Sequence, residues 1–206
     1  MGDIFGIEPG SIIETTEESP SFNVSSRLLG RVIDGMGAPL DGKGPIPLGQ
    51  RYNIMGVPMN PLERARVNQP LDVGIRAING LLTCARGQRV GIMAGAGVGK
   101  SILMGMIARN TAADINVIAL IGERGREVKE FIEESLGPEG LKKSVVVAAT
   151  SDQPPPVRLR GAFIATTIAE YFRSLGKDVI LMMDSVTRFA LAQREIGLAA
   201  GEPPTT

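Results

Sequence analysis

Apolar and polar positions divide the chain into two parts with different patterns. From residue 88 onward, short continuous apolar runs alternate with longer segments whose apolar residues recur at helical spacing. The runs predict strands at 89–94, 116–121, 145–149 and 179–183, and the longer segments predict helices at 102–112, 127–136, 154–175 and 185–198. Strands that alternate with helices indicate βαβ units, and uninterrupted apolar runs are typical of buried parallel strands. The pattern therefore predicts an α/β fold with a parallel sheet and helices on both faces.

The first part of the chain is polar and rich in turns. Residues 1–25 predict one or two strands, which are too few to form a sheet alone. A further strand is predicted at 28–33, followed by turns in the Gly, Pro and Asp-rich stretch 34–47. Residues 71–82 carry apolar side chains at helical spacing, so a helix is expected there. Farther along, Gly137 and the proline after it are expected to end the helix 127–136.

A glycine-rich segment lies between the first predicted strand of the second part and the helix that follows. It reads AGAGVGKS over residues 94–101 and matches a P-loop with Ala in place of the first Gly. Glycines let backbone N–H groups surround phosphate oxygens, and the helix N-terminus adds free donors. Lys100 is expected to contact the β- and γ-phosphates, and the Ser101 hydroxyl to bind Mg²⁺. The predicted nucleotide-binding residues are Gly95, Ala96, Gly97, Val98, Gly99, Lys100, Ser101 and Ile102.

Acidic residues follow two of the predicted strands, and ligands of parallel sheets bind at the carboxyl ends of strands. Asp184 ends the run VILMMD and is expected to hold Mg²⁺, although an Asp here can also cap the next helix. Glu123 follows the strand 116–121 and is a candidate for activating the attacking water. The alternative is an exposed acid at a helix start, and the acidic residues 127–134 are expected on such an exposed helix face.

Composition excludes several kinds of chemistry. The chain of 206 residues has no His, which rules out His-based catalysis and His-ligated metals. One cysteine, Cys84, rules out an internal disulfide framework and a Cys-cluster zinc site. The 22 basic and 22 acidic residues give no net charge and so no support for nucleic-acid binding. No signal peptide or membrane-spanning run is visible, so a cytoplasmic location is expected.

Four long blocks carry a family resemblance. GQRVGIMAGAGVGKS, ALIGERGREVKEFIEE, VVVAATSDQPP and DSVTRFALAQREIGLAAGEPP closely resemble the type III export ATPases. These are the motors of the bacterial flagellum and of injectisomes, and they are homologous to the catalytic β subunit of rotary ATP synthases. The resemblance covers residues 28–206 and implies a P-loop ATPase core of RecA/F1-like fold at 26–206. Remnant strands of a small N-terminal β-barrel domain are implied at 1–25, and both domains are expected to be partial.

The resemblance also implies roles in ATP hydrolysis for particular residues. It places Glu123 at the attacking water, Lys100 and Ser101 at phosphate and Mg²⁺, Asp184 at the metal, and Arg124 and Arg188 beside the nucleotide and the subunit interface. ATP and Mg²⁺ are the implied cofactors. The form VRLRGAFIATTIAEYF favours the flagellar branch. Family members are about twice this length, so the arginine finger and the adenine-stacking aromatic are expected outside this sequence.

The resemblance further implies a homohexameric ring and a set of partners. These are the stalk and regulator proteins of the export apparatus and complexes of export substrates with chaperones, with no nucleic acid. The implied location is cytoplasmic and peripheral at the inner-membrane export apparatus, beside its export gate. Two alternatives share the core fold: an RNA-translocating ring ATPase of Rho type and a nucleotide-binding, non-catalytic ring subunit. The neutral charge gives no support to the first, and Glu123 speaks against the second.

Overall fold

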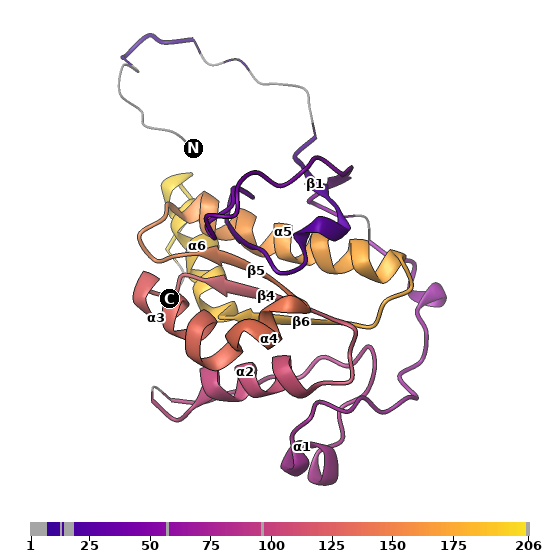
Figure 1. Ribbon diagram of the computed structural model, residues 1–206. Coiled ribbons are helices and arrows are strands. Elements are labelled where there is room, and N and C mark those ends of the chain that lie inside the picture. The colour runs from indigo at the N-terminus through magenta and orange to yellow at the C-terminus, as the bar shows by residue number, and fades with distance from the viewer. Residues whose placement is uncertain (1–7, 13, 15–18, 57, 96, 205–206) are drawn as a thin grey trace.

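The computed structural model describes residues 8–12, 14, 19–56, 58–95 and 97–204. Its centre is a four-stranded parallel sheet (Figure 1). In spatial order the strands are β2 (Val32–Asp34), β5 (Ser144–Ala149), β4 (Ile115–Ile121) and β6 (Val179–Asp184). Every residue of β4 and β5 is buried, as expected for parallel strands with both faces covered. The predicted α/β fold is confirmed, and three of the four strands predicted after residue 88 form.

Helices cover both faces of the sheet, and the alternation of β4 side chains divides the core between them. Val117 and Ile121 point to the face of the sheet that α5 (Pro155–Ser174) covers. Residues of the N-terminal part pack on the same face. Ile118 and Leu120 pack on the opposite side with α2 (Lys100–Asn110). The remaining helices of the second part are α3 (Gly125–Glu130), the π-helix η3 (Phe131–Leu136), α4 (Gly137–Lys142) and α6 (Val186–Ala199).

The prediction of a strand at 89–94 is wrong. These residues are irregular, and Val90 and Met93 are 59% and 95% exposed. Within the described residues, the side of β6 away from β4 pairs with no strand. A strand gains its stability from hydrogen bonds to a neighbour and from burial of its side chains, and this segment has neither. An apolar run favours a strand but cannot supply the partner that a strand needs.

Two helix boundaries also differ from the prediction. The helical region that begins at Gly125 does not end at Gly137, because α4 follows η3 directly. Gly137 has a φ of +64°, which redirects the chain, and Pro138 then lies in the first turn of α4, where its missing N–H costs no hydrogen bond. The helix predicted at 71–82 shrinks to α1 (Arg76–Leu81).

The N-terminal residues form a small sheet on α5. β1 (Ser21–Val24) pairs antiparallel with β3 (Gln50–Asn53), and Tyr52 packs edge-on against Tyr171 of α5 with ring centroids 5.8 Å apart. The strand predicted at 28–33 begins only at Val32, because residues 26–28 form a short 3₁₀ helix, η1. Residues 1–7, 13 and 15–18 of the predicted barrel end lie outside the described residues. The assignment of 1–25 to a barrel stays a prediction.

The turn-rich stretch after β2 is held by an ion pair. Arg31 donates from Nε to Asp41 Oδ2 at 2.6 Å and from a terminal nitrogen to Asp41 Oδ1 at 2.9 Å. The same guanidinium donates to the Gly44 carbonyl. These bonds hold the pKa of Asp41 well below its usual range. Charge-assisted hydrogen bonds therefore help to fix this loop, in addition to the packing of Ile46 against the core.

Candidate nucleotide-binding site

The P-loop lysine and the aspartate at the end of β6 meet at the carboxyl edge of the sheet. Lys100 Nζ lies 2.5 Å from Asp184 Oδ1, and the Asp184 side chain is only 5% exposed. Asp184 reaches this place because it is the last residue of β6, and Lys100 because it is the first residue of α2. Two residues far apart in the sequence thus form one charged pair at the position where parallel sheets bind ligands.

The rest of the predicted phosphate loop is open to solvent. Gly97 and Gly99 have φ values of +75° and +94°, and a Cβ on either would meet no atom. The backbone conformation, and not crowding, therefore favours glycine at both positions. Gly95, Val98, Ser101 and Ile102 are exposed beside them, and Ala96 lies outside the described residues. The first turn of α2 has amide groups without helical partners, and such groups bind anions.

Glu123 lies next to the Lys100–Asp184 pair in an environment that favours its neutral form. Its side chain is 14% exposed, and Arg188 Nε is 3.3 Å from its Oε1. Burial is the main cause that raises the pKa of Glu123 to about 7, followed by a hydrogen bond with Glu127 and the negative charge of Asp184. Arg188 opposes these effects. A carboxyl group with a pKa near 7 is suited to accept a proton at neutral pH.

The two predicted arginines take different positions. Arg188 lies in the first turn of α6 and contacts both the Gly122 carbonyl and Glu123. Arg124 is 74% exposed in its side chain and pairs with Glu127 of the next helical turn at 3.2 Å. The structure therefore brings Lys100, Asp184, Glu123 and Arg188 together at one edge, whereas Arg124 turns toward its own helix.

Glu127 is a site residue that the sequence did not indicate. Its position in a charged helical segment is typical of a solvent-exposed face. In the structure it shares a hydrogen bond with Glu123, and the same bond lowers its own pKa. Its carboxylate also lies 3.4 Å from the Arg124 backbone N–H. The spacing of one helical turn from Glu123 is the signal that could have found it.

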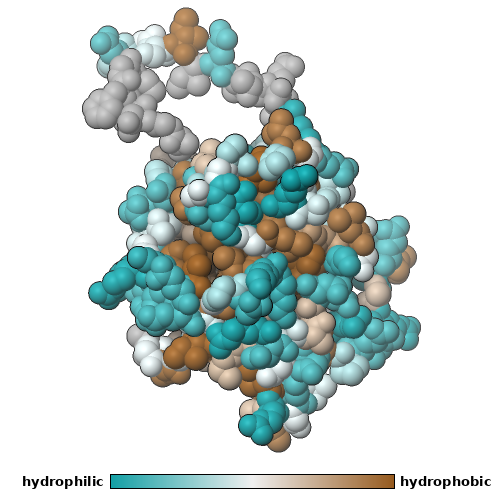
Figure 2. All heavy atoms as spheres, in the orientation of Figure 1, coloured by the Kyte–Doolittle hydropathy of each residue, from teal (hydrophilic) through white to brown (hydrophobic). Residues whose placement is uncertain are grey.

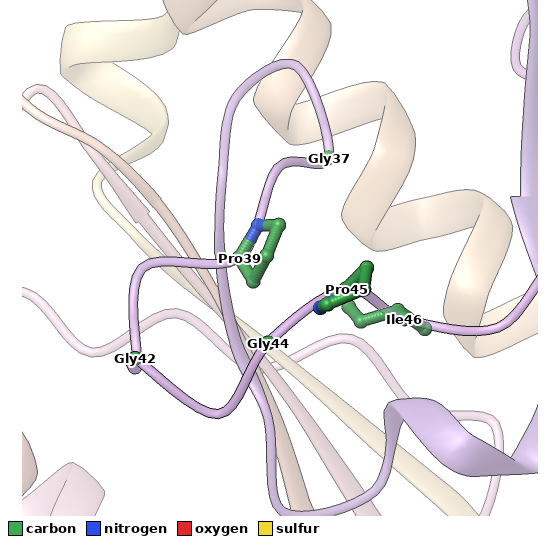
Figure 3. Close-up of a pocket in the computed structure, with 6 residues that line it drawn as sticks. All are labelled: Gly37, Pro39, Gly42, Gly44, Pro45 and Ile46. Carbon is green, nitrogen blue, oxygen red and sulfur yellow. The ribbon is translucent and has the colours of Figure 1, made fainter.

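The structure also contains a hollow that none of these site residues lines. It has a volume of about 550 Å³ and lies in the turns after β2, lined by Gly37, Pro39, Gly42, Gly44, Pro45 and Ile46 (Figure 3). None of these side chains can ionise or act as a nucleophile. The hollow is therefore not a candidate for chemistry.

Fold and site together define a class of protein. A glycine-rich loop opens a helix beside a parallel sheet, and its lysine meets the buried aspartate that ends β6. This is the arrangement of a P-loop nucleotide-binding domain. Residues 74–206 match the family model of the ATP synthase alpha/beta family, nucleotide-binding domain. The chain belongs to this family.

Curated relatives and solved structures place the chain more closely. It is 60% identical over 204 residues to the flagellum-specific ATP synthase of Bacillus subtilis, covering 97% of this chain and 46% of the relative. It is 52% identical to the type 3 secretion system ATPase of Xanthomonas euvesicatoria, over 100% of this chain and 46% of that protein. The chain therefore spans about half the length of the curated relatives it matches.

A solved structure of the assembled ATPase EscN from the type III secretion system of enteropathogenic E. coli superposes with a TM-score of 0.87 and 50% identity. The match covers 98% of this chain and 49% of EscN. A second structure, of EscN with its central stalk EscO, gives a TM-score of 0.84 and 54% identity over 90% of this chain and 46% of EscN. The resemblance to type III export ATPases is confirmed.

Within the part of the chain that the structure describes, no helix is long and apolar enough to cross a membrane.

Proposed function

We propose that the protein to which this chain belongs hydrolyses ATP with Mg²⁺ and drives the delivery and unfolding of substrates by a type III export apparatus. The flagellar branch is preferred. The observation that carries the proposal is the 2.5 Å contact between Lys100 and Asp184, with Glu123 beside it. Relatives named as flagellum-specific ATP synthases and as a type 3 secretion system ATPase support the biological assignment.

The chemistry follows from the positions of these groups. Lys100 carries the positive charge that stabilises the phosphate oxygens in the transition state. Glu123, with a pKa near 7, orients the attacking water and accepts its proton. The amides of the first turn of α2 hold phosphate without adding any net charge. Lys100 and the amides therefore act on the phosphate oxygens, whereas Glu123 acts on the attacking water.

The residues present also fit a magnesium ion. The Ser101 hydroxyl and the Asp184 carboxylate are hard oxygen donors, the type that Mg²⁺ prefers. Asp184 is nearly buried and forms an ion pair with Lys100. When bound, the ion would neutralise charge that develops on the phosphate oxygens. Ser101 and Asp184 are the residues that would hold it.

The ring and the partners are part of the same proposal. We infer a homohexamer whose sites are completed by an arginine of the neighbouring subunit. It would contact stalk and regulator proteins and substrate–chaperone complexes, at the cytoplasmic side of the inner-membrane export gate. Support comes from EscN, which has been solved as an assembled ATPase and in complex with its central stalk.

The decisive test removes the lysine. In the full-length protein, Lys100→Ala is expected to lower ATP turnover about 100-fold or more, because the transition-state charge loses its main cation. Circular dichroism should show an intact fold. Lys177→Ala is the matched control, since Lys177 is exposed in the turn after α5, and the turnover of this variant should stay within about twofold of wild type. Turnover of Lys100→Ala within a few-fold of wild type would reject the site.

A further inference from the structure

Asn116 is a polar residue inside an otherwise apolar strand. It is the second residue of β4, and its side chain is fully buried. Because strand residues alternate between the two faces of a sheet, Asn116 lies on the same face as Ile118 and Leu120, the face that α2 covers (Figure 1). An amide in a core is unfavourable unless it is hydrogen-bonded, so the partners of Asn116 decide what it does there.

The side-chain amide of Asn116 binds the carboxyl end of α2. Its Nδ2 donates to the Ala108 carbonyl at 2.8 Å. In a longer helix this carbonyl would accept from the backbone N–H of Ala112, but that N–H donates to the Asp72 carbonyl at 2.9 Å instead. The last carbonyls of a helix lack partners within the helix, and a side chain that bonds to one of them satisfies it. A central strand of the sheet is thereby bonded to the helix that begins with Lys100.

Apolar side chains make up the core between α2 and the sheet. Met104 and Ala108 are buried there together with Ile118. Apolar packing favours close contact but has no preferred direction, so it opposes separation of the helix from the sheet more than sliding along the helix axis. A hydrogen bond has a preferred length and angle. Asn116 therefore adds a directional restraint at the carboxyl end of α2.

We propose that Asn116 is a positioning residue whose bond to Ala108 sets the axial position of α2, and with it the position of Lys100 and of the phosphate-binding first turn. The inference rests on the proposed ATPase function and deepens it. At the helical rise, Ala108 lies about 12 Å beyond Lys100 along the axis of one continuous helix, so a shift at one end moves the other. A displacement of about 1 Å is enough to lower a rate about 100-fold.

Ser144 provides a matched control on the neighbouring strand. It is the partner of Asn116 in the register of β4 and β5, and it is equally buried. Its hydroxyl donates to the Gly140 carbonyl of α4 at 2.6 Å and lies 3.3 Å from Asn116 Nδ2. Ser144 therefore holds α4, whereas Asn116 holds α2. A substitution at either position removes a buried polar contact at the same level of the sheet.

Equilibrium binding of a fluorescent ATP analogue to the full-length protein tests the proposal. Asn116→Val is expected to weaken binding about tenfold or more, because Lys100 and the first turn of α2 no longer meet the phosphates in the same geometry. The fold should stay intact, with a urea midpoint within about 0.5 M of wild type, because valine suits a buried strand and Asn116 Oδ1 has no hydrogen-bond partner among the described residues.

Two further variants separate the bond to α2 from general packing. Asn116→Ser keeps a hydroxyl but is too short to reach the Ala108 carbonyl, so it should bind the analogue as weakly as Asn116→Val. Ser144→Ala should bind it within about threefold of wild type, because the bond to α2 is kept. If Ser144→Ala and Asn116→Val weaken binding equally, or if Asn116→Ser binds like wild type, the proposal is wrong.

Hydrogen exchange of the full-length protein separates this inference from the proposed function. In Asn116→Val the amides of α2 should exchange about tenfold faster than in wild type, whereas those of α5, on the other face of the sheet, should be unchanged. Ser144→Ala should leave α2 unchanged. Unchanged exchange of α2 in Asn116→Val, or equal acceleration in α2 and α5, overturns the inference. Wild-type protein without ATP turnover contradicts the proposed function instead, and the exchange pattern still decides whether Asn116 holds α2.

Discussion

The side chain of Glu123 shows how one residue acquires its chemistry from its neighbours. An exposed glutamate is ionised well below neutral pH, but here burial and two nearby acids stabilise the protonated form and raise the pKa to about 7. Below that value Glu123 holds a proton, and above it the carboxylate can accept one. Glu123 therefore changes from the protonated form to the form that can act as a base close to neutral pH.

This environment predicts a pH dependence. Turnover of the wild-type protein should rise with pH, with a midpoint at about 7, because only the ionised Glu123 can take a proton from water. Glu123→Gln should lower kcat about 100-fold or more and keep ATP binding, because the amide is of similar size but cannot act as a base. The measurements are kcat against pH and equilibrium binding of a fluorescent ATP analogue. A wild-type rate independent of pH between about 6 and 8 would contradict the assignment.

The site residues fall into two groups: those that a local sequence motif predicts and those whose role depends on contacts in the fold. Lys100 and Asp184 could be predicted because each lies in a local pattern whose chemistry is written in adjacent residues. The roles of Gly122 and Glu127 are not written in adjacent residues, because they depend on contacts with Arg188 and Glu123. For Glu127 the spacing of one helical turn from Glu123 is a signal, but it does not show the contact. Local motifs reveal the groups that meet a ligand, whereas the groups that position them emerge only from the packing of separate elements.

At the scale of elements, α2 is held against the π-helix η3 by a close approach of backbones. A Cβ on Gly105 of α2 would meet the Ser135 carbonyl oxygen at 2.4 Å and its carbon at 2.7 Å. Met104 and Ala108 flank this point and pack into the core below. Glycine is unfavourable in a helix interior, so its presence here reflects the space that the crossing leaves.

The crossing predicts the sign of two alanine substitutions. Gly105→Ala should lower the free energy of unfolding by about 1–3 kcal/mol, because overpacking outweighs the gain in helix propensity of about 1 kcal/mol. Gly80→Ala is the control: it lies in α1, where an added Cβ meets no atom within 4 Å, and should stabilise by about 0.5–1 kcal/mol. Urea denaturation measures both. If both substitutions changed the free energy of unfolding equally and with the same sign, helix propensity and not packing would determine the effect at Gly105.

The predicted elements succeed where burial and periodicity agree. The runs 116–121 and 145–149 became β4 and β5, which lie in the middle of the sheet and are wholly buried. The helix predicted at 154–175 became α5, whose apolar side covers the same strands. The run 89–94 is also largely apolar, but it forms no strand. A strand depends on a partner elsewhere in the chain, and hydrophobicity alone does not carry that information.

At the scale of the whole molecule, the two edge strands of the sheet have different neighbours. The edge strand β2 is short, and the turns that follow it fold back beside it, where Pro39 forms an isolated β-bridge with Ile33. The edge at β6 pairs with no strand among the described residues, and its Leu181 is 39% exposed. Figure 2 shows apolar side chains in separate patches between hydrophilic ones on the face in view. Unpaired strand edges and exposed apolar side chains both favour association between chains.

The segment before the P-loop, residues 86–100, forms ion pairs near both ends of β6. Arg86 pairs with Asp178 at 2.7 Å just before the strand, and Lys100 pairs with Asp184 at its last residue. The residues between these ties include Val90, Ile92 and Met93, all of them exposed. An apolar segment is thus held by the charges at its ends while its own side chains stay unburied. Its association with another surface would bury area at no cost in existing contacts.

This arrangement predicts that Met93 promotes self-association of the 206-residue chain. Sedimentation velocity should show concentration-dependent association that Met93→Lys reduces, because the substitution places a charge on a side chain that is 95% exposed. The free energy of unfolding should change by less than about 0.5 kcal/mol, since the methionine packs against little. Leu62→Lys is the control: it is 93% exposed in the short helix η2 (Pro61–Glu63), which belongs to neither sheet. Equal reductions in association by both substitutions would assign the effect to net charge rather than to the segment before the P-loop.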